Sequence, residues 1–370
     1  MLGLTKPYFL GVDFGTSSIK AVELTLKQGK PYLSNFGQVD LTALEKGELF
    51  SQNSSYDQEL VLYLRALLSR LKPKSGSASV AMPAFIGLIS LIEFPEMEEK
   101  ELEEAIQFEA HKYIPSPLQD IALSWDVVGI QPAVPGNSAR MEVLLVAALK
   151  KEVERYRGYV EAVDLKMDFL ELETFSLVRS TLGDEPGLRM VIDIGSRATN
   201  LVLVESGVVR VSRNLDTGGK DLTRTLMEGL DITQERAEEL KKSGKDFLNA
   251  PESAMTFPSL QMIASEAQRM LASYQAKYPE AVCRGIILSG GTAHLFGIIE
   301  YFSKILGLPV GLGNPWRHIA FHPSRSADVE RLGTSFSVAL GLALSTFDAM
   351  RKEKIKKKSV SIKDIFNKKI

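Results

Sequence analysis

A polar turn between two apolar runs is the first stretch whose residue types and spacing could do chemistry. Residues 10–24 read as an apolar strand ending at Asp13, a turn over Gly15–Ser18, and a second apolar strand that contains Lys20. Glycine in such a turn lets backbone N–H groups approach an anion, and successive N–H groups form a concavity for phosphate. Asp13 repels phosphate unless a cation or its water lies between them, whereas Lys20 could reach the phosphates as a point charge. One copy alone is more often an ordinary β-turn.

The same pattern recurs half a chain later. In residues 190–205, Asp193, Gly195 and Ser196 fall at the positions of the aspartate, the glycine and the first hydroxyl of the first turn. Internal repetition at this distance predicts two equivalent lobes. Each lobe would offer one hairpin to a phosphate chain lying between them.

The composition is that of an ordinary globular chain with more than one lobe. Its 370 residues are 45% apolar and 24% charged, and this length favours two lobes over one core. The single cysteine, Cys283, excludes an intramolecular disulfide and suits a reducing compartment. We find no apolar run of the roughly 18–20 residues that span a bilayer, and no apolar signal-peptide core at the amino terminus. These features predict a cytoplasmic protein, and the four scattered histidines predict no transition-metal site.

The charge of the chain is unevenly distributed. The net charge is −2, but residues 351–370 hold nine basic and two acidic side chains, which leaves the remainder at about −9. Such an asymmetry indicates an interaction tail. Ile362, Ile365, Phe366 and Ile370 have near-helical spacing among the lysines, so this tail is either a solvated disordered segment or a short membrane-surface helix.

Apolar periodicity and turn signals divide the rest of the chain. Residues 84–162 read as a β-α-β-β-α insertion, and Met167–Leu182 as a helix that crosses from the first lobe to the second. Other predicted helices cover residues 57–71, 98–113 and 150–163 and most of 221–280, with strands at 79–91, 121–130, 140–149 and 207–213.

Three further features stand near the second repeat. Gly218 and Gly219 form a turn before a helix, and residues 285–297 read as a buried strand, a glycine turn and a helix start. Such a turn lets backbone lie flat against a planar ring. Glu238 and Lys241 are i,i+3 neighbours, which is as compatible with a surface ion pair as with a site.

These residues together resemble a known set. Asp13-Phe-Gly-Thr, Asp193-Ile-Gly-Ser and Leu288-Ser-Gly-Gly-Thr-Ala are similar to the two phosphate motifs and the adenosine motif of the actin/heat-shock chaperone/sugar kinase superfamily. Within it, the helix and stop at 101–115 resembles the hallmark of the PilM family of type IV pilus assembly proteins. Lys20-Ala-Val-Glu-Leu24 and Gly313-Asn-Pro-Trp316 are also similar to that family, and the resemblance covers residues 8 to 346.

The resemblance implies an α/β, actin-like (ribonuclease H-like) two-lobe ATPase fold with an insertion of the kind found in FtsA and PilM. It implies the following division: 1–83 first lobe; 84–162 insertion; 163–186 return and crossing helix; 187–218 second lobe; 219–284 helical subdomain; 285–348 second lobe with the adenosine motif; 349–370 basic tail.

The resemblance also implies ATP and Mg²⁺ in the cleft, with Asp13 and Asp193 holding magnesium through water. The nucleotide-binding residues carried over are Asp13, Gly15, Thr16, Ser17, Ser18, Lys20, Asp193, Gly195, Ser196, Gly218, Gly219, Glu238, Lys241, Gly290, Gly291 and Thr292.

Glu173 matches the position that orients the attacking water in hydrolytic relatives, for which a carboxylate is chemically suited. Active relatives often continue the second phosphate turn with Gly-Gly-Thr, whereas this chain has Arg197-Ala-Thr. A bulky arginine there is expected to obstruct the γ-phosphate region. We therefore expect slow hydrolysis at most, with nucleotide acting as a ligand that stabilises lobe closure.

The function implied is that of an ATP-binding scaffold at the inner face of the inner membrane. Its expected partner is the cytoplasmic amino-terminal peptide of a PilN-like membrane protein, bound between the first lobe and the insertion within the pilus assembly complex. Self-association is left open, and no nucleic-acid partner is expected. The alternatives are an FtsA-like division protein attached through its tail and a small-molecule kinase of the same fold.

Overall fold

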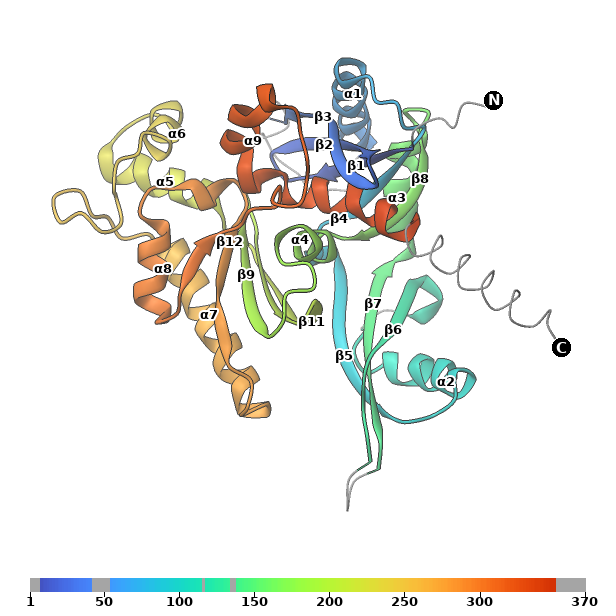
Figure 1. Ribbon diagram of the computed structural model, residues 1–370. Coiled ribbons are helices and arrows are strands. Elements are labelled where there is room, and N and C mark those ends of the chain that lie inside the picture. The colour runs from blue at the N-terminus through green and yellow to red at the C-terminus, as the bar shows by residue number, and fades with distance from the viewer. Residues whose placement is uncertain (1–6, 42–53, 115–116, 134–137, 351–370) are drawn as a thin grey trace.

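The computed structural model describes residues 7–41, 54–114, 117–133 and 138–350 (Figure 1). Three features of the sequence lie outside this part of the chain: the basic tail at 351–370 with its apolar positions, the Pro115 helix stop, and most of the turn at 132–137.

The first lobe is built on a five-stranded sheet in the order β3-β2-β1-β4-β8. Its strands are β1 (Tyr8–Phe14), β2 (Ser18–Lys27), β3 (Lys30–Asp40), β4 (Ser77–Met82) and β8 (Lys166–Leu172). The first three strands are antiparallel, and β4 pairs parallel with both β1 and β8. The predicted helix at 57–71 is confirmed as part of α1 (Ser54–Leu71), whose leucines pack on this sheet.

The second lobe repeats this arrangement strand for strand, in the order β11-β10-β9-β12-β13. The strands are β9 (Leu188–Ile194), β10 (Thr199–Glu205), β11 (Val208–Leu215), β12 (Cys283–Ser289) and β13 (Val310–Leu312). Three are antiparallel and two follow in parallel, as in the first lobe. The two equivalent lobes predicted from the repeated aspartate turns are therefore confirmed.

Helices α5 (Gly219–Leu230), α6 (Gln234–Lys241), α7 (Pro258–Lys277) and α8 (Ile298–Leu306) contribute to the core of the second lobe. Helix α9 (Ser326–Leu332) comes later in the chain, and its Val329 belongs to an apolar cluster of the first lobe that includes Phe9 and Val22. The buried faces of α5, α7 and α8 join β9, β10 and β12 in one apolar core. Short 3₁₀ turns complete the elements at Ala84–Ile86, Leu118–Asp120, Gly291–His294, Pro323–Arg325 and Gly333–Phe336.

An inserted subdomain, formed by β5 (Gly87–Pro95), α2 (Glu99–Ala110), β6 (Ile121–Gln131) and β7 (Arg140–Leu149), hangs below the first lobe (Figure 1). Its sheet order is β5-β7-β6, and α2 buries Leu102 and Ile106 against one face of it. The element order β-α-β-β-α predicted for 84–162 is confirmed, with α3 (Lys150–Glu161) as the last helix. By its contacts α3 packs in the core of the first lobe, where Tyr156 and Tyr159 meet Phe14.

The predicted helix Met167–Leu182 is wrong in its first third. Residues 166–172 form β8, and α4 (Glu173–Thr181) begins only afterwards. β8 pairs in parallel along the whole of β4 and satisfies backbone groups that β4 would otherwise leave unpaired. This tertiary pairing overrides the local helical spacing of the apolar residues.

Two helices cross at the junction of the lobes: α4 and the helix at 337–350. A Cβ on Gly341 would lie 2.0 Å from the carbonyl oxygen of Ser176, so only glycine permits this approach. Val338 and Leu342 share an apolar cluster with Val191 of β9. One helical stretch among the described residues, Pro323–Met350, is long and apolar enough to span a membrane by composition, but 61% of its apolar window is buried inside this fold.

Candidate functional site

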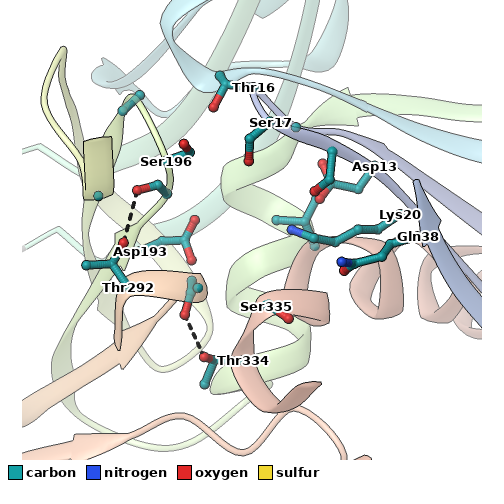
Figure 2. A pocket seen from close by; sticks show the side chains of 18 of the residues that line it. Asp13, Thr16, Ser17, Lys20, Gln38, Asp193, Ser196, Thr292, Thr334 and Ser335 are labelled. Carbon is teal, nitrogen blue, oxygen red and sulfur yellow. Dashed lines mark hydrogen bonds between the residues drawn. The ribbon is translucent and has the colours of Figure 1, made fainter. Parts of the chain in front are cut away.

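Both aspartate hairpins open into one cavity of about 740 Å³ between the lobes. Figure 2 shows Asp13 and Lys20 reaching into this space from the first lobe, with Asp193 and Ser196 facing them from the second. Of the sequence-predicted site residues, only Gly218 does not line the cavity. The two motifs, half a chain apart in sequence, are thus brought together.

The two hairpins have the same backbone closure. In the first, the Gly15 amide donates to the Ser18 carbonyl at 3.0 Å; in the second, the Gly195 amide donates to the Ala198 carbonyl at 2.9 Å. Lys20 lies directly opposite Asp13 in the β1–β2 register, so both side chains share one face of the sheet. The equivalent position in the second hairpin, opposite Asp193, is Asn200. The two copies therefore differ in charge.

The start of α5 supports the second hairpin. The amides of Gly219 and Lys220 donate to the carbonyls of Gly195 and Ser196 at 2.9 and 2.8 Å. A Cβ on Gly218 would lie 2.7 Å from the Gly195 carbonyl oxygen. Gly218 is therefore needed for this close approach, which explains why it supports the turn without lining the cavity.

Glu238 and Lys241 do not form a free surface pair. The Lys241 ammonium donates to Glu238 Oε1 at 2.9 Å, to Thr223 Oγ1 at 2.9 Å and to the Gly219 carbonyl at 3.0 Å. Burial lowers the pKa of Lys241. Burial would raise the pKa of Glu238, but the hydrogen bonds that Thr223 and Lys241 donate to its carboxylate outweigh burial, and that pKa is lowered. The pair fastens α6 to α5 at the cavity wall.

The glycine turn after β12 lines the cavity beside the start of α5. Gly290 has φ +86°, and a Cβ there would lie 2.4 Å from the Ile194 carbonyl oxygen, so it brings the turn against the end of β9. Gly291 has open space at its Cβ position. Thr292 donates to the Gly195 carbonyl at 3.3 Å, and Thr334 donates to the Gly290 carbonyl at 2.8 Å.

Three carboxyl groups line the floor of the cavity. Burial raises the pKa of Glu173 to about 8, opposed by the Ala84 amide, which donates to Glu173 Oε1 at 3.0 Å, and reinforced by the charges of Asp13 and Asp193. Burial also raises the pKa of Asp193 to about 6 and the pKa of Asp13 above its ordinary value, against the charge of Lys20. One lysine thus faces three acids, one buried and two half-buried, which is the electrostatic setting of a cation site.

A cation here would take most of its ligands from water or phosphate, with at most two of these carboxylates. Among the described residues, no group of three or more His, Cys, Asp or Glu side chains is placed to ligate a metal directly. Mg²⁺ usually keeps several waters and takes one or two carboxylates. The chemistry of the side chains at this floor fits that mode of binding.

Glu173→Gln should change how stability depends on pH. The folded state keeps the Glu173 proton up to about pH 8, whereas the unfolded chain releases it near 4.5. Stability of the wild type should therefore fall between pH 5 and pH 8 by at most about 1.4 kcal/mol per unit relative to Glu173→Gln. Urea denaturation without nucleotide or Mg²⁺ measures this difference. Glu103→Gln, on the exposed face of α2, is the control, and parallel curves for wild type and Glu173→Gln would contradict the assignment.

The structure removes the steric argument against hydrolysis. Arg197 was expected to obstruct the cavity, but its neighbours Ser196 and Ala198 line the cavity and Arg197 does not. The Arg197 charge instead acts on the pKa of Tyr56, at the start of α1 in the first lobe: burial raises this pKa to about 12, and the charge opposes the rise. The obstruction expected from Arg197 is therefore not seen among the residues that line the cavity.

Sequence reasoning missed several residues that line the cavity: Gln38, Asp40, Phe85, Asn200, Asn214, His294, Arg331, Thr334 and Ser335. Asn200 could have been found, because aligning the second hairpin on the first places it at the Lys20 position. Thr334 follows Gly333 in a turn that only the packing of the chain brings beside Gly290. No local signal in the sequence points to it.

Two lobes of equal topology, each giving one aspartate hairpin to a shared cavity, define an actin-like protein. Solved structures agree with this class. A structure described as the PilM-PilN type IV pilus biogenesis complex superimposes with a TM-score of 0.75 at 25% identity, covering 91% of this chain and 98% of that one. The ethanolamine utilization protein EutJ from Carboxydothermus hydrogenoformans shares the fold, with a TM-score of 0.55, 20% identity and 92% and 90% coverage.

The family is narrower than the fold. The family described as type IV pilus assembly protein PilM matches residues 11–347, and the chain belongs to it. Curated relatives include the cell division protein FtsA of Streptococcus pneumoniae serotype 2, 20% identical over 357 residues (83% of this chain, 76% of the relative). FtsA of Neisseria meningitidis serogroup B is 23% identical over 231 residues, 55% of this chain. The chain spans only 56% of the length of that relative.

Proposed function

We propose that this chain binds ATP with Mg²⁺ and acts as a cytoplasmic component of type IV pilus assembly at the inner face of the inner membrane. Its partner is the cytoplasmic amino-terminal peptide of a PilN-like membrane protein. The observation that carries the nucleotide part is the convergence of Asp13 and Asp193, from topologically equivalent hairpins, on one cavity of about 740 Å³. Membership of the PilM family supports the pilus part.

Each wall of the cavity has a part in this proposal. The turns Gly15–Ser18 and Gly195–Ser196 offer backbone to phosphate, and Lys20 adds a charge. Gly290, Gly291 and Thr292 cover adenosine, while Glu238 and Lys241 flank ribose and adenine. Asp13 and Asp193 hold Mg²⁺ through water. The ion, when bound, neutralises phosphate charge and lowers the pKa values of the acids at the floor of the cavity.

We expect slow hydrolysis at most, with Glu173 as the residue that would act on water. The pKa of its carboxyl is about 8 in the nucleotide-free protein, so this group is mostly protonated at pH 7 and could accept a proton from water only once a bound cation lowers that pKa. Its Oε1 also accepts the Ala84 amide. Nucleotide then serves mainly as a ligand that stabilises one arrangement of the lobes.

The peptide part is supported by the similarity to the PilM-PilN complex. The first lobe offers β8, the last strand in its sheet order, and Phe169 on this strand is 42% exposed. An extended segment can add to such a strand edge through main-chain hydrogen bonds while its side chains enter apolar pockets. We place the peptide between this edge and the inserted subdomain.

A labelled synthetic peptide with the amino-terminal sequence of the PilN-like protein tests this partner. We expect saturable binding to the full chain by fluorescence anisotropy. Phe169→Glu should weaken binding at least about tenfold, because exposed aromatic anchors dominate such contacts. Met262→Glu, at a somewhat more exposed position on α7, should leave binding unchanged. Equal signals from the native and a scrambled peptide would reject the proposal.

A further inference from the structure

The inserted subdomain is tied to the second lobe as well as to the first. Arg210 of β11 reaches across to Glu142 of β7, with Nη1 2.6 Å from Oε2, and its Nη2 lies 3.0 Å from Glu205 Oε2. A second ion pair joins the same two parts: Lys277 of α7 lies 3.1 Å from Glu93 of β5. The inserted subdomain therefore bridges the two lobes outside the nucleotide cavity.

The ion pair between Arg210 and Glu142 is largely buried, and the surrounding chain leaves space for it. The side chains of Arg210 and Glu142 are only 15% and 8% exposed, and Arg210 Nε has no hydrogen-bond partner in the described structure. Gly129, opposite Glu142, leaves room for the carboxylate, because a Cβ there would lie 2.8 Å from Glu142 Oε2. Removing one partner of such a pair leaves a buried charge unpaired.

Strands β11 and β5 both connect these ion pairs with the cavity. On β11, Asn214 lines the cavity and Ser212 donates to Asn200 Oδ1 at 3.3 Å, while Arg210 lies further along the strand at a register shift in its pairing with β10. β5 starts just after Phe85, which also lines the cavity, and ends near Glu93. β5 and β11 lie side by side in Figure 1 and contact one another. These contacts connect the cavity to the inserted subdomain through packed strands of the second lobe and of the insertion.

We propose that Arg210 is a positioning residue that ties the inserted subdomain to the second lobe, so that nucleotide in the cavity changes the affinity of the neighbouring groove for its peptide. This inference rests on the proposed function and adds its regulation. Two sites that bias one two-state element are coupled reciprocally. Peptide therefore also changes the affinity for nucleotide by the same factor.

The test measures peptide affinity with and without a non-hydrolysable Mg²⁺–ATP analogue. Wild type should show a ratio of at least about fivefold between the two affinities. The variant Arg210→Met/Glu142→Met/Lys277→Met should show a ratio within about twofold while still binding each ligand alone. Arg210→Lys, which keeps the charge beside Glu142, should retain the coupling. The control Arg157→Met/Glu154→Met removes an exposed pair of equal length on α3 and should change nothing.

A second readout does not depend on the peptide. Spin labels at Phe108→Cys on α2 and Met262→Cys on α7 occupy exposed positions on the two parts, while Cys283 is buried. Their distance distribution should be narrow in wild type and broad in the triple variant. An unchanged distribution, or an unchanged affinity ratio in that variant, overturns the inference. If the peptide binds neither with nor without nucleotide, both the proposed partner and the inference are wrong. If the peptide binds wild type but nucleotide does not change its affinity, the inference alone is wrong.

Discussion

Gly341→Ala should lower the free energy of unfolding by about 3 kcal/mol or more, at the upper end of what overpacking costs. The added methyl group would lie 2.0 Å from the carbonyl oxygen of Ser176 and 2.8 Å from its Cα, so the obstacle is rigid backbone. The helix at 337–350 and α4 would have to move apart at the junction of the lobes. Urea denaturation of the full chain measures the effect.

Gly158→Ala is the matched control. Gly158 also lies within a helix, α3, but has no atom within 4 Å of its Cβ position. Alanine there should raise stability by up to about 1 kcal/mol through helix propensity and reduced freedom of the unfolded chain. Opposite signs for the two substitutions are expected. Equal midpoints for Gly341→Ala and wild type would show that the two helices do not meet as described.

Asp13→Asn should weaken Mg²⁺–ATP binding by about tenfold to a hundredfold, in line with the loss of a carboxylate that holds the metal through water. The same change removes the Asp13 charge, which helps to raise the pKa values of Glu173 and Asp193. The nucleotide-free protein should therefore be as stable as wild type or more so. Isothermal titration calorimetry and urea denaturation of the same preparation measure the two effects.

Asp40→Asn is the control that distinguishes a specific role of Asp13 in binding Mg²⁺–ATP from a general effect of negative charge in the cavity. Asp40 also lines the cavity but is exposed, at the end of β3. Its loss should change Mg²⁺–ATP affinity by no more than about threefold, as expected for a screened surface charge. If Asp13→Asn binds Mg²⁺–ATP as tightly as wild type, the proposed cation site is wrong.

The sequence predicted the parts of the fold that depend on local backbone chemistry. The aspartate turns recur because each hairpin needs glycine at the same point, and this repeat led to the two lobes before any contact was known. Long amphipathic helices such as α1 and the β-α-β-β-α order of the inserted subdomain were predicted for the same reason. Periodicity is a property of each segment by itself.

What the sequence did not predict depends on packing between distant segments. Residues 166–172 have apolar spacing that suits a helix, yet β4 offers a strand edge that only the folded sheet creates. Arg197 is bulky by composition, but the direction of its side chain follows from the turn. Gln38 and Thr334 line the cavity because separate elements converge there, and nothing in their own neighbourhoods marks them.

The two hairpins are unequal partners for a charged ligand. Opposite Asp13 stands the cation Lys20, whereas opposite Asp193 stands the neutral Asn200. Coulomb attraction to a triphosphate is therefore stronger at the first hairpin than at the second. The second lobe should then contribute mainly through its other lining residues, among them Lys241 and the glycine turn at Gly290.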